Sequence, residues 1–318
     1  MATSGSTNFT NTRNEIVNDA LMLLTTYGAD ETVSAEDSAY ACRTLNRMIK
    51  AWAAQGVHLW KKDIAYLFLQ ADQLEYSLKS TSSDHATLSY VETTLSADEA
   101  IAQTTISVTS STGMSAADYV GLENEDGELQ WTTINNVPDS TSIVIDDPLT
   151  VACEEGAKVY AYTTPLKEPF NVYSAAKESE SGIDTPLNYL SFEDYFQLPD
   201  KTAGGIPVSY TYDRQLNDGI IRVWPVPEDV DYIVKLTISR KIEDFDTASN
   251  TPDFPQEWLE ALVMNLAVKL APAFGKASGP NYAALAQSAQ NALMTAATFD
   301  NEQGSLCMQP NYEGGSGY

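Results

Sequence analysis

Residues 205–275 read GIPVSYTYDRQLNDGIIRVWPVPEDVDYIVKLTISRKIEDFDTASNTPDFPQEWLEALVMNLAVKLAPAFG, and they hold the clearest succession of strand, turn and helix signals in the chain. The first part predicts two strands that join at Asn217-Asp218-Gly219, a turn sequence typical of β-hairpins. The segment Trp224-Pro225-Val226-Pro227 ends the second strand because proline cannot donate to a sheet ladder. We therefore expect Pro225 and Pro227 to fix a corner. Another strand follows, and Pro255 marks the start of a helix.

That helix carries apolar residues four positions apart. Trp258, Leu262 and Leu266 share one face, and Pro272 breaks the pattern. We expect this face to anchor helix packing. A second C-terminal helix starts near residue 280, and its alanine-rich face suits close contact with another helix.

The N-terminal part predicts a further pair of helices. Thr12 and Glu15 form a capping box that opens the first, and Gly28 stops it. The second begins after Ser34 and ends at residues 55–56. Alternating residues between 66 and 78 then predict a β-hairpin with a polar turn at 71–73. The Ser-, Thr-, Asp- and Glu-rich segment 80–105 reads as a linker.

From residue 104 to 162 the pattern is only of strands, in five short segments with an Asp126-Gly127 turn between the second and third. We interpret residues 90–164 as an inserted all-β barrel or sandwich module. A short helix is predicted after Ser191. The predicted fold class is thus α+β: a helical body of two N-terminal and two C-terminal helices, a mixed β region and the inserted module. The predicted domains are residues 1–80, 90–164 and 165–299, with a flexible tail at 300–318.

Charge and cysteine content limit the possible functions. The chain has 18 Lys and Arg against 44 Asp and Glu, a formal charge of −26 that repels phosphate and disfavours sequence-dependent DNA recognition. An acidic wall around a DNA channel remains compatible with this charge. Cys42, Cys153 and Cys307 are too far apart for a disulfide framework or a paired zinc site, which predicts folding in a reducing cytoplasm. No apolar signal core or membrane-length run occurs, so no membrane contact is expected.

Residues for catalysis are scarce. The two histidines, His58 and His85, are expected to be a packed or solvent-facing side chain and a linker residue, respectively. Adjacent carboxylates at 98–99, 146–147 and 154–155 could suit glycoside hydrolysis or calcium binding, but such pairs occur by chance in so acidic a chain. No dinucleotide, P-loop or zinc-protease motif occurs. We therefore predict no enzyme activity, no catalytic residue, no metal and no cofactor.

Two regions of the chain resemble a known family. The first is the helix pair NEIVNDALMLLTTYGADETVSAEDSAYACRTLNRMIKAWAAQG with the following LFLQADQLEYSL. The second contains PLNYLSFEDYFQLPDKTAGGIP, VWPVP and DFPQEWLEALVMNLAVKLAPAFG. In this order they resemble the head-to-tail adaptors of short-tailed bacteriophages, also called tail accessory factors or packaged-DNA stabilisation proteins. The β insert at about 90–164 departs from the compact members.

This resemblance implies a virion protein at the head-tail junction that folds in the host cytoplasm. A ring of about twelve copies would bind the portal and neighbouring tail or neck proteins, extend the DNA channel, stabilise the packaged DNA and give the tail its platform. Double-stranded DNA would pass through without sequence-specific binding. Pro255, Trp258, Leu262 and Leu266 would serve helix packing and the ring interface, and Met308, Tyr312 and Tyr318 would dock into the portal. The alternative is a carbohydrate-binding or carboxylate-based hydrolase component of a phage tail.

Overall fold

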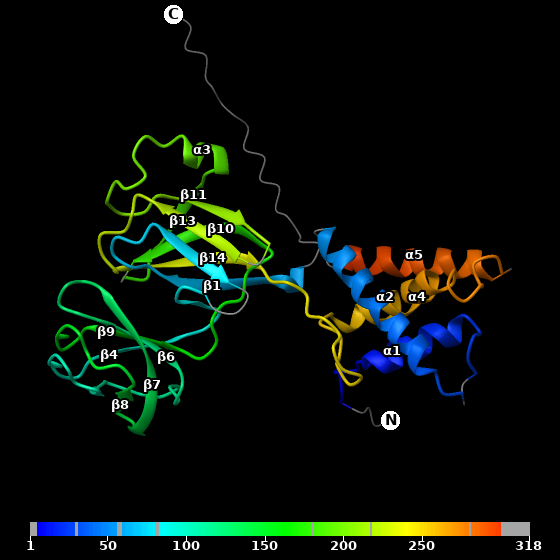
Figure 1. The fold of residues 1–318 in the computed structure, drawn as a ribbon, viewed down its shortest axis with the longest axis horizontal. Coiled ribbons are helices and arrows are strands. Elements are labelled where there is room, and N and C mark those ends of the chain that lie inside the picture. The colour runs from blue at the N-terminus through cyan, green and yellow to red at the C-terminus, as the bar shows by residue number, and fades with distance from the viewer. Residues whose placement is uncertain are drawn as a thin grey trace, which may run out of the picture. The chain divides into compact units, whose positions relative to one another are not determined.

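The structure is a computed structural model that describes residues 5–28, 31–55, 59–79, 83–179, 181–216, 218–279 and 281–299. It divides into two compact units. The helical unit comprises residues 1–60 and 242–318, and the β unit comprises residues 61–241. The β unit is thus inserted, along the chain, between the two halves of the helical unit (Figure 1).

The helical unit has helices from both ends of the chain. These are α1 (Arg13–Leu23), α2 (Ala35–Ala54), the 3-10 turn η2 (Gln256–Trp258), α4 (Leu259–Leu270) and α5 (Tyr282–Phe299). The capping box at Thr12 and Glu15 forms, and the Ser34 hydroxyl accepts a hydrogen bond from the Asp37 amide. Each satisfies backbone donors that the first turn leaves free, which explains why the helices begin there. Apolar side chains of α1, α2 and α4 form one buried core.

The β unit contains a curled eight-stranded sheet. Its strands, in spatial order, are β2 (Glu75–Lys79), β13 (Asp218–Trp224), β12 (Ser209–Arg214), β11 (Asp184–Tyr189), β10 (Asn171–Ser179), β14 (Tyr232–Ser239), β1 (Lys62–Phe68) and β3 (Ala86–Thr87). All neighbours are antiparallel except β11 and β12. A bridge between Leu78 and Ser83 joins the end of β2 to the segment before β3, so the sheet nearly closes on itself. The predicted pairing of β12 with β13 is confirmed.

A six-stranded antiparallel sheet completes the β unit. Its order is β4 (Val91–Thr94), β9 (Lys158–Tyr162), β6 (Tyr119–Glu123), β7 (Leu129–Asp139), β8 (Ser142–Ile145) and β5 (Thr105–Ser107). The bridge between Leu95 and Val108 links the ends of its two edge strands, β4 and β5. Apolar side chains that point inward from this sheet form a buried core. An aromatic cluster around Phe68, Tyr160 and Tyr162 fills the space between the two sheets. Closing both sheets leaves little unpaired strand edge.

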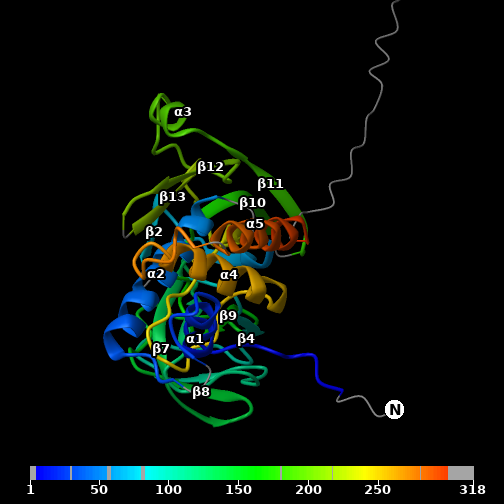
Figure 2. The same ribbon diagram turned by 90° about the vertical axis from the view of Figure 1, so that its right-hand side faces the viewer.

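The predicted fold class is wrong. The chain is mostly β, with fourteen strands in two curled sheets and five α-helices among the described residues, so no helical body dominates it. Helices α1, α2 and α3 have capping side chains, and the longer helices follow a 3.6-residue period, whereas short strands such as β3 and β10 carry a weak signal. Sequence reasoning therefore gave the helices too much weight. Figures 1 and 2 show how much of the molecule the sheets make up.

Two local predictions also fail. The segments 66–70 and 74–78 do not pair as a hairpin, because β1 pairs with β14 and β3 while β2 pairs with β13. The turn between them is held instead by the Asp72 amide, which donates to the Pro227 carbonyl at 2.8 Å. The predicted linker at 80–105 holds β3, β4 and the buried Leu95. In both cases the main partner strands lie far away in sequence, so turn residues between neighbouring segments do not indicate the pairing.

Candidate assembly surfaces

A short helix, α3 (Phe192–Phe196), projects from the eight-stranded sheet and is visible at the top of Figures 1 and 2. The Ser191 hydroxyl caps it by accepting from the Asp194 amide at 3.1 Å. At its other end, the Lys201 ammonium donates to the carbonyls of Phe196 and Leu198, both at 3.1 Å. A cation on the last carbonyls of a helix is favourable because those groups have no helical partner. The sequence thus builds a one-turn helix with both ends satisfied.

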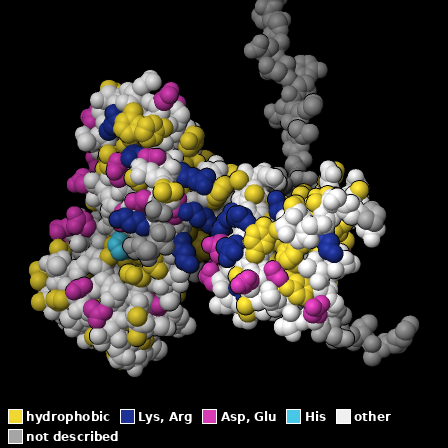
Figure 3. All heavy atoms as spheres, turned by 45° about the vertical axis from the view of Figure 1, so that its right-hand side comes forward, with side chains coloured by type: hydrophobic (Ala, Val, Ile, Leu, Met, Phe, Trp, Pro, Cys, Tyr) yellow, Lys and Arg dark blue, Asp and Glu magenta, His cyan; other side chains and the backbone are white. Residues whose placement is uncertain are grey.

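Large apolar side chains on and beside α3 face solvent. We call this set the α3 surface, and its members are 45 to 58 % exposed: Tyr189, Phe192, Phe196, Ile206 and Val208. In Figure 3 hydrophobic side chains gather near the top of the β unit, in the region of α3. Contiguous exposed apolar groups of this kind mark interaction sites on folded proteins.

Arg222 of β13 supports the α3 surface from below. Its Nε lies 2.6 Å from a Glu75 carboxylate oxygen and its Nη1 lies 3.4 Å from Asp213. The guanidinium also lies 5.9 Å from the ring centre of Tyr195, the buried residue of α3, and 5.7 Å from that of Phe196. The ion pairs and the cation–π contacts together attach α3 to the sheet.

The rim of the α3 surface is acidic. Glu193, Asp194 and Asp200 are exposed there. Hydrogen bonds from the Thr202 hydroxyl and amide lower the pKa of Asp200, so this carboxylate stays ionised at neutral pH. The α3 surface therefore combines an aromatic centre with negative charge at its border.

A group of cations lies at the other end of the same sheet. We call it the basic edge, and it consists of Lys62, Lys167, Arg214, Arg240 and Lys241. Strand register places Lys62 and Asn171 beside Ser239, which precedes Arg240 and Lys241, and Arg214 lies over the ring of Phe170, which precedes Asn171. In a chain with a net charge of −26 such a concentration of cations is unusual.

Aromatic rings accompany these cations. The Arg214 guanidinium lies 4.0 Å from the ring centre of Phe170, and the Lys62 ammonium lies 5.4 Å from that of Tyr173. Tyr173 and Ile64 are themselves among the exposed large apolar residues. The basic edge thus offers apolar contact area together with positive charge.

The helical unit has a groove of its own. It is lined by apolar residues of α1, α4 and the segment before α1, among them Phe9, Met22, Leu23 and Val263. Helix α5 has no Asp, Glu, Lys or Arg, and its Met294 and Phe299 are exposed. An uncharged helix with exposed apolar residues is typical of an element that meets a partner.

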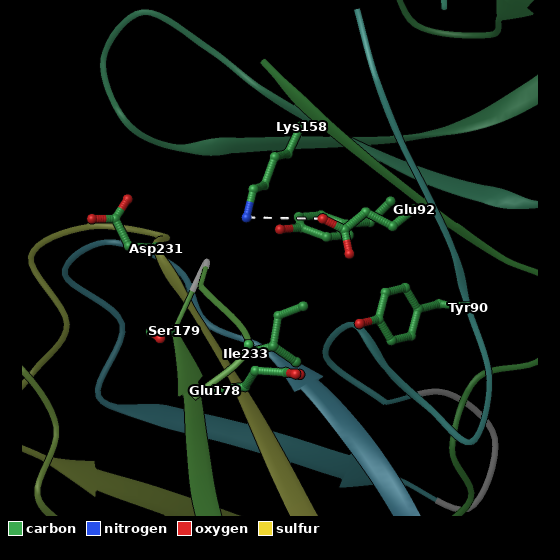
Figure 4. Close-up of a pocket in the computed structure, with 9 residues that line it drawn as sticks. Tyr90, Glu92, Lys158, Glu178, Ser179, Asp231 and Ile233 are labelled. Carbon is green, nitrogen blue, oxygen red and sulfur yellow. Dashed lines mark ion pairs between the residues drawn. The ribbon is translucent and has the colours of Figure 1, made fainter. Parts of the chain in front are cut away.

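A small polar pocket lies between the two sheets of the β unit (Figure 4). Lys158 and Glu92 face each other across it, with Nζ and Oε1 3.8 Å apart. Glu178, which also lines it, is paired with Lys235 at 2.9 Å. Burial raises the pKa of the nearby Tyr90 hydroxyl to about 12. The two glutamates therefore have cationic partners, which favours a structural role for them.

Comparison with protein families identifies the chain. Residues 144–309 match the SU10 adaptor protein family, a stretch that covers just over half of the 318 residues. The chain belongs to the SU10 adaptor protein family. A comparison with curated proteins finds no match.

Membership implies a structural role in a phage particle and interaction with other head or tail proteins. The prediction of a phage adaptor is confirmed at this level. Within the described residues, no helix is long and apolar enough to cross a bilayer, and no group of three His, Cys, Asp or Glu side chains could hold a metal ion.

The residues predicted for helix packing lie inside the helical unit. Trp258, Leu262 and Leu266 are 2, 0 and 0 % exposed. The Trp258 ring lies 5.8 Å from that of Trp52 and 5.2 Å from that of Trp60. Pro255 precedes η2, and its carbonyl accepts from the Trp258 amide at 3.0 Å. That these residues serve the ring interface in this adaptor stays a prediction.

The predicted corner residues lie where β13 ends. The peptide bond between Trp224 and Pro225 is cis. Between Pro225 and Pro227, Val226 exchanges backbone hydrogen bonds of 2.9 Å with Ala203 and Gly205. Met308, Tyr312, Tyr318, His58 and Asn217 lie outside the described residues.

The carboxylates considered for chemistry serve local structure. Glu99 is buried and accepts from the Ser107 amide at 2.6 Å, and Asp98 accepts from the Glu155 amide at 2.8 Å. Hydrogen bonds from Thr133 and Asn135 lower the pKa of Asp146, which makes it a poor general acid. His85 is not in a linker, since it stacks on Trp131.

Sequence reasoning missed the α3 surface and the basic edge. The short helix was predicted, and the spacing of Phe192 and Phe196 puts both on one face, which was a usable signal. The members of the basic edge are scattered between residues 62 and 241. No local pattern could bring them together, because the strand order does so.

Proposed function

We propose that this adaptor forms a ring at the head-tail junction of a short-tailed phage. In this proposal the ring binds the portal, continues the DNA channel, retains the packaged genome and gives the tail its attachment platform. The observation that carries it is membership of the SU10 adaptor family over residues 144–309. The chain would act through shape and association, with no reactive centre.

The surfaces of the chain support this proposal. A ring of identical copies needs contacts between two different faces of each copy, and the α3 surface and the basic edge are two such faces. The negative charge of the chain suits a conduit from which a duplex must slide freely, because like charges reduce sticking. A portal would then be met by surfaces of the helical unit, such as the groove beside α1 and α4.

Electron microscopy of the protein mixed with the portal of the same phage tests the proposal. We expect a ring of density stacked on one end of the portal. The number of adaptor copies in the ring should equal the number of portal subunits or stand in a simple ratio to it. The portal alone serves as the control. A portal that stays bare in the presence of excess adaptor would contradict the proposal.

A further inference from the structure

We propose that the α3 surface of one copy binds the basic edge of a second copy of the same chain. This inference rests on the proposed ring and names the contact that closes it. The contact is heterologous, because the two faces that meet are different.

The α3 surface has the composition of an interface centre. Its two phenylalanines and its tyrosine are about half exposed in a single copy. Aromatic residues supply much of the binding energy where a partner covers them and excludes water. Arg222 holds the α3 helix in place through its contacts with Glu75 and Tyr195, so the face is preorganised before binding.

Charge indicates a second copy as the partner. Copies with a charge of −26 repel one another, so association needs a local match of opposite charges. The rim of the α3 surface carries the exposed Glu193, Asp194 and Asp200. The basic edge carries the exposed Lys62, Lys167 and Arg214, whereas Lys241 beside them is paired with the buried Glu168 of its own chain at 2.5 Å. The chain therefore contains both halves of the match.

Both faces also expose apolar side chains that could pack against each other. Beside the cations of the basic edge, Ile64 and Tyr173 are exposed. Phe192 and Phe196 of a neighbour can cover these side chains while their rings lie near the Lys62 ammonium and the Arg214 guanidinium. Such cation–π contacts add to the apolar contact.

One copy cannot join its own two faces. Strand β12 connects them: Tyr210 pairs with Tyr189 of the α3 surface, and Arg214 of the basic edge lies four residues further along the strand. At about 3.3 Å per residue the faces are about 13 Å apart on a rigid sheet. Each copy thus presents one face of each kind to other copies, which is the arrangement that builds rings or chains.

The test uses two double variants of the full chain. The edge variant is Lys62→Glu with Arg214→Glu, and the α3 variant is Phe192→Ala with Phe196→Ala. The matched controls are Lys269→Glu with Lys276→Glu, which change the charge equally, and Leu88→Ala with Ile101→Ala, which remove exposed apolar groups elsewhere on the β unit. Circular dichroism and thermal unfolding establish that every variant is folded.

Sedimentation velocity over a concentration series then measures association. We expect the wild type and both controls to associate, and each variant alone to bind itself at least about tenfold more weakly. An equimolar mixture of the two variants should form dimers and nothing larger, because it retains one intact pair of faces. Added salt should weaken wild-type association.

Three results would overturn the inference: a wild type that stays monomeric throughout, a variant that associates like the wild type, or a mixture that forms no dimers. Binding of the wild type to the portal is measured separately. A wild type that does not bind the portal would contradict the proposed function. If the wild type binds the portal and the two variants still form rings as the wild type does, only the contact proposed here would be contradicted.

Discussion

The imidazole of His85 stacks on the indole of Trp131, with ring centres 4.0 Å apart and planes inclined by 6°. His85 lies just before β3 of the eight-stranded sheet, and Trp131 belongs to β7 of the six-stranded sheet. His85 Nδ1 also lies 3.2 Å from the Tyr162 hydroxyl. Burial lowers the pKa of His85 to about 4, against a weaker opposing effect of Asp84. This contact joins the two sheets while His85 is neutral.

The stacked pair makes stability depend on pH. The folded state takes up a proton at His85 only near its pKa of about 4, whereas the unfolded chain does so near about 6.5. The contribution is therefore complete above about pH 6.5 and decreases as the pH falls towards 4. Between about pH 7 and pH 4.5 the wild type should lose up to about 3 kcal/mol more stability than His85→Asn. Asparagine suits the positive φ of 40° at this position.

Urea unfolding of both proteins at the two pH values measures this difference. Carboxylates that titrate in the same range affect both proteins alike, so the comparison isolates His85. Parallel loss of stability in the wild type and the variant would show that His85 titrates normally.

Gly121 of β6 lies directly under the Trp131 indole. A Cβ atom at this position would lie 2.8 Å from the ring, closer than side chains tolerate. Gly121→Ala should therefore lower the free energy of unfolding by about 1 to 3 kcal/mol by displacing the indole. Gly28→Ala is the control, because its Cβ would meet nothing within 4 Å. Equal melting temperatures of the two variants would refute the close packing.

Arg222 should matter more to stability than Lys235, a less buried cation with as many carboxylate partners. Arg222→Ala removes contacts to Glu75, Asp213 and the α3 rings from a side chain that is 9 % exposed, and should cost about 3 kcal/mol. Lys235→Ala breaks more exposed ion pairs, with Glu178 and Asp184, and should cost less than about 1 kcal/mol. Chemical unfolding gives both values. We also expect faster amide exchange in α3 for Arg222→Ala but not for Lys235→Ala. Equal losses of stability in the two variants would contradict the role of Arg222 in attaching α3 to the sheet.

The C-terminal segment 300–318 contains Met308, Tyr312 and Tyr318, which we propose as portal contacts. The segment is poor in apolar residues, so its composition predicts that it does not fold on its own. Its deletion should change the free energy of unfolding by less than about 0.5 kcal/mol and weaken binding to the portal. Co-sedimentation of full-length and truncated protein with the portal compares them. Undiminished binding by the truncated protein would exclude this role.

Local signals in the sequence were reliable where a few neighbouring residues decide the structure. Thr12, Ser34 and Ser191 cap helices as predicted, and β12 pairs with β13 as predicted. In each case the hydrogen bonds that decide the structure lie within four residues or so of one another, so propensity and turn chemistry suffice.

Long-range pairing was not accessible in this way. β1 and β2 are neighbours in sequence but lie far apart in the sheet order. β3 and β4 were taken for linker because their partners lie well outside that segment: β3 pairs with β1 and β4 pairs with β9, as in Val91 with Ala161. The dominance of β structure and the basic edge both follow from such pairings. The α3 surface could be predicted only in part, since the sequence indicates its helix but not the exposure of its aromatic residues.

The most direct test of the account is to examine phage particles produced without this protein. We expect heads that package DNA but release it, and that carry no tails, with both properties restored when the wild-type chain is supplied from a plasmid. Electron microscopy and nuclease sensitivity of the packaged genome give the two readouts. Particles that keep their DNA protected and attach tails normally without the chain would contradict its role as a head-tail adaptor.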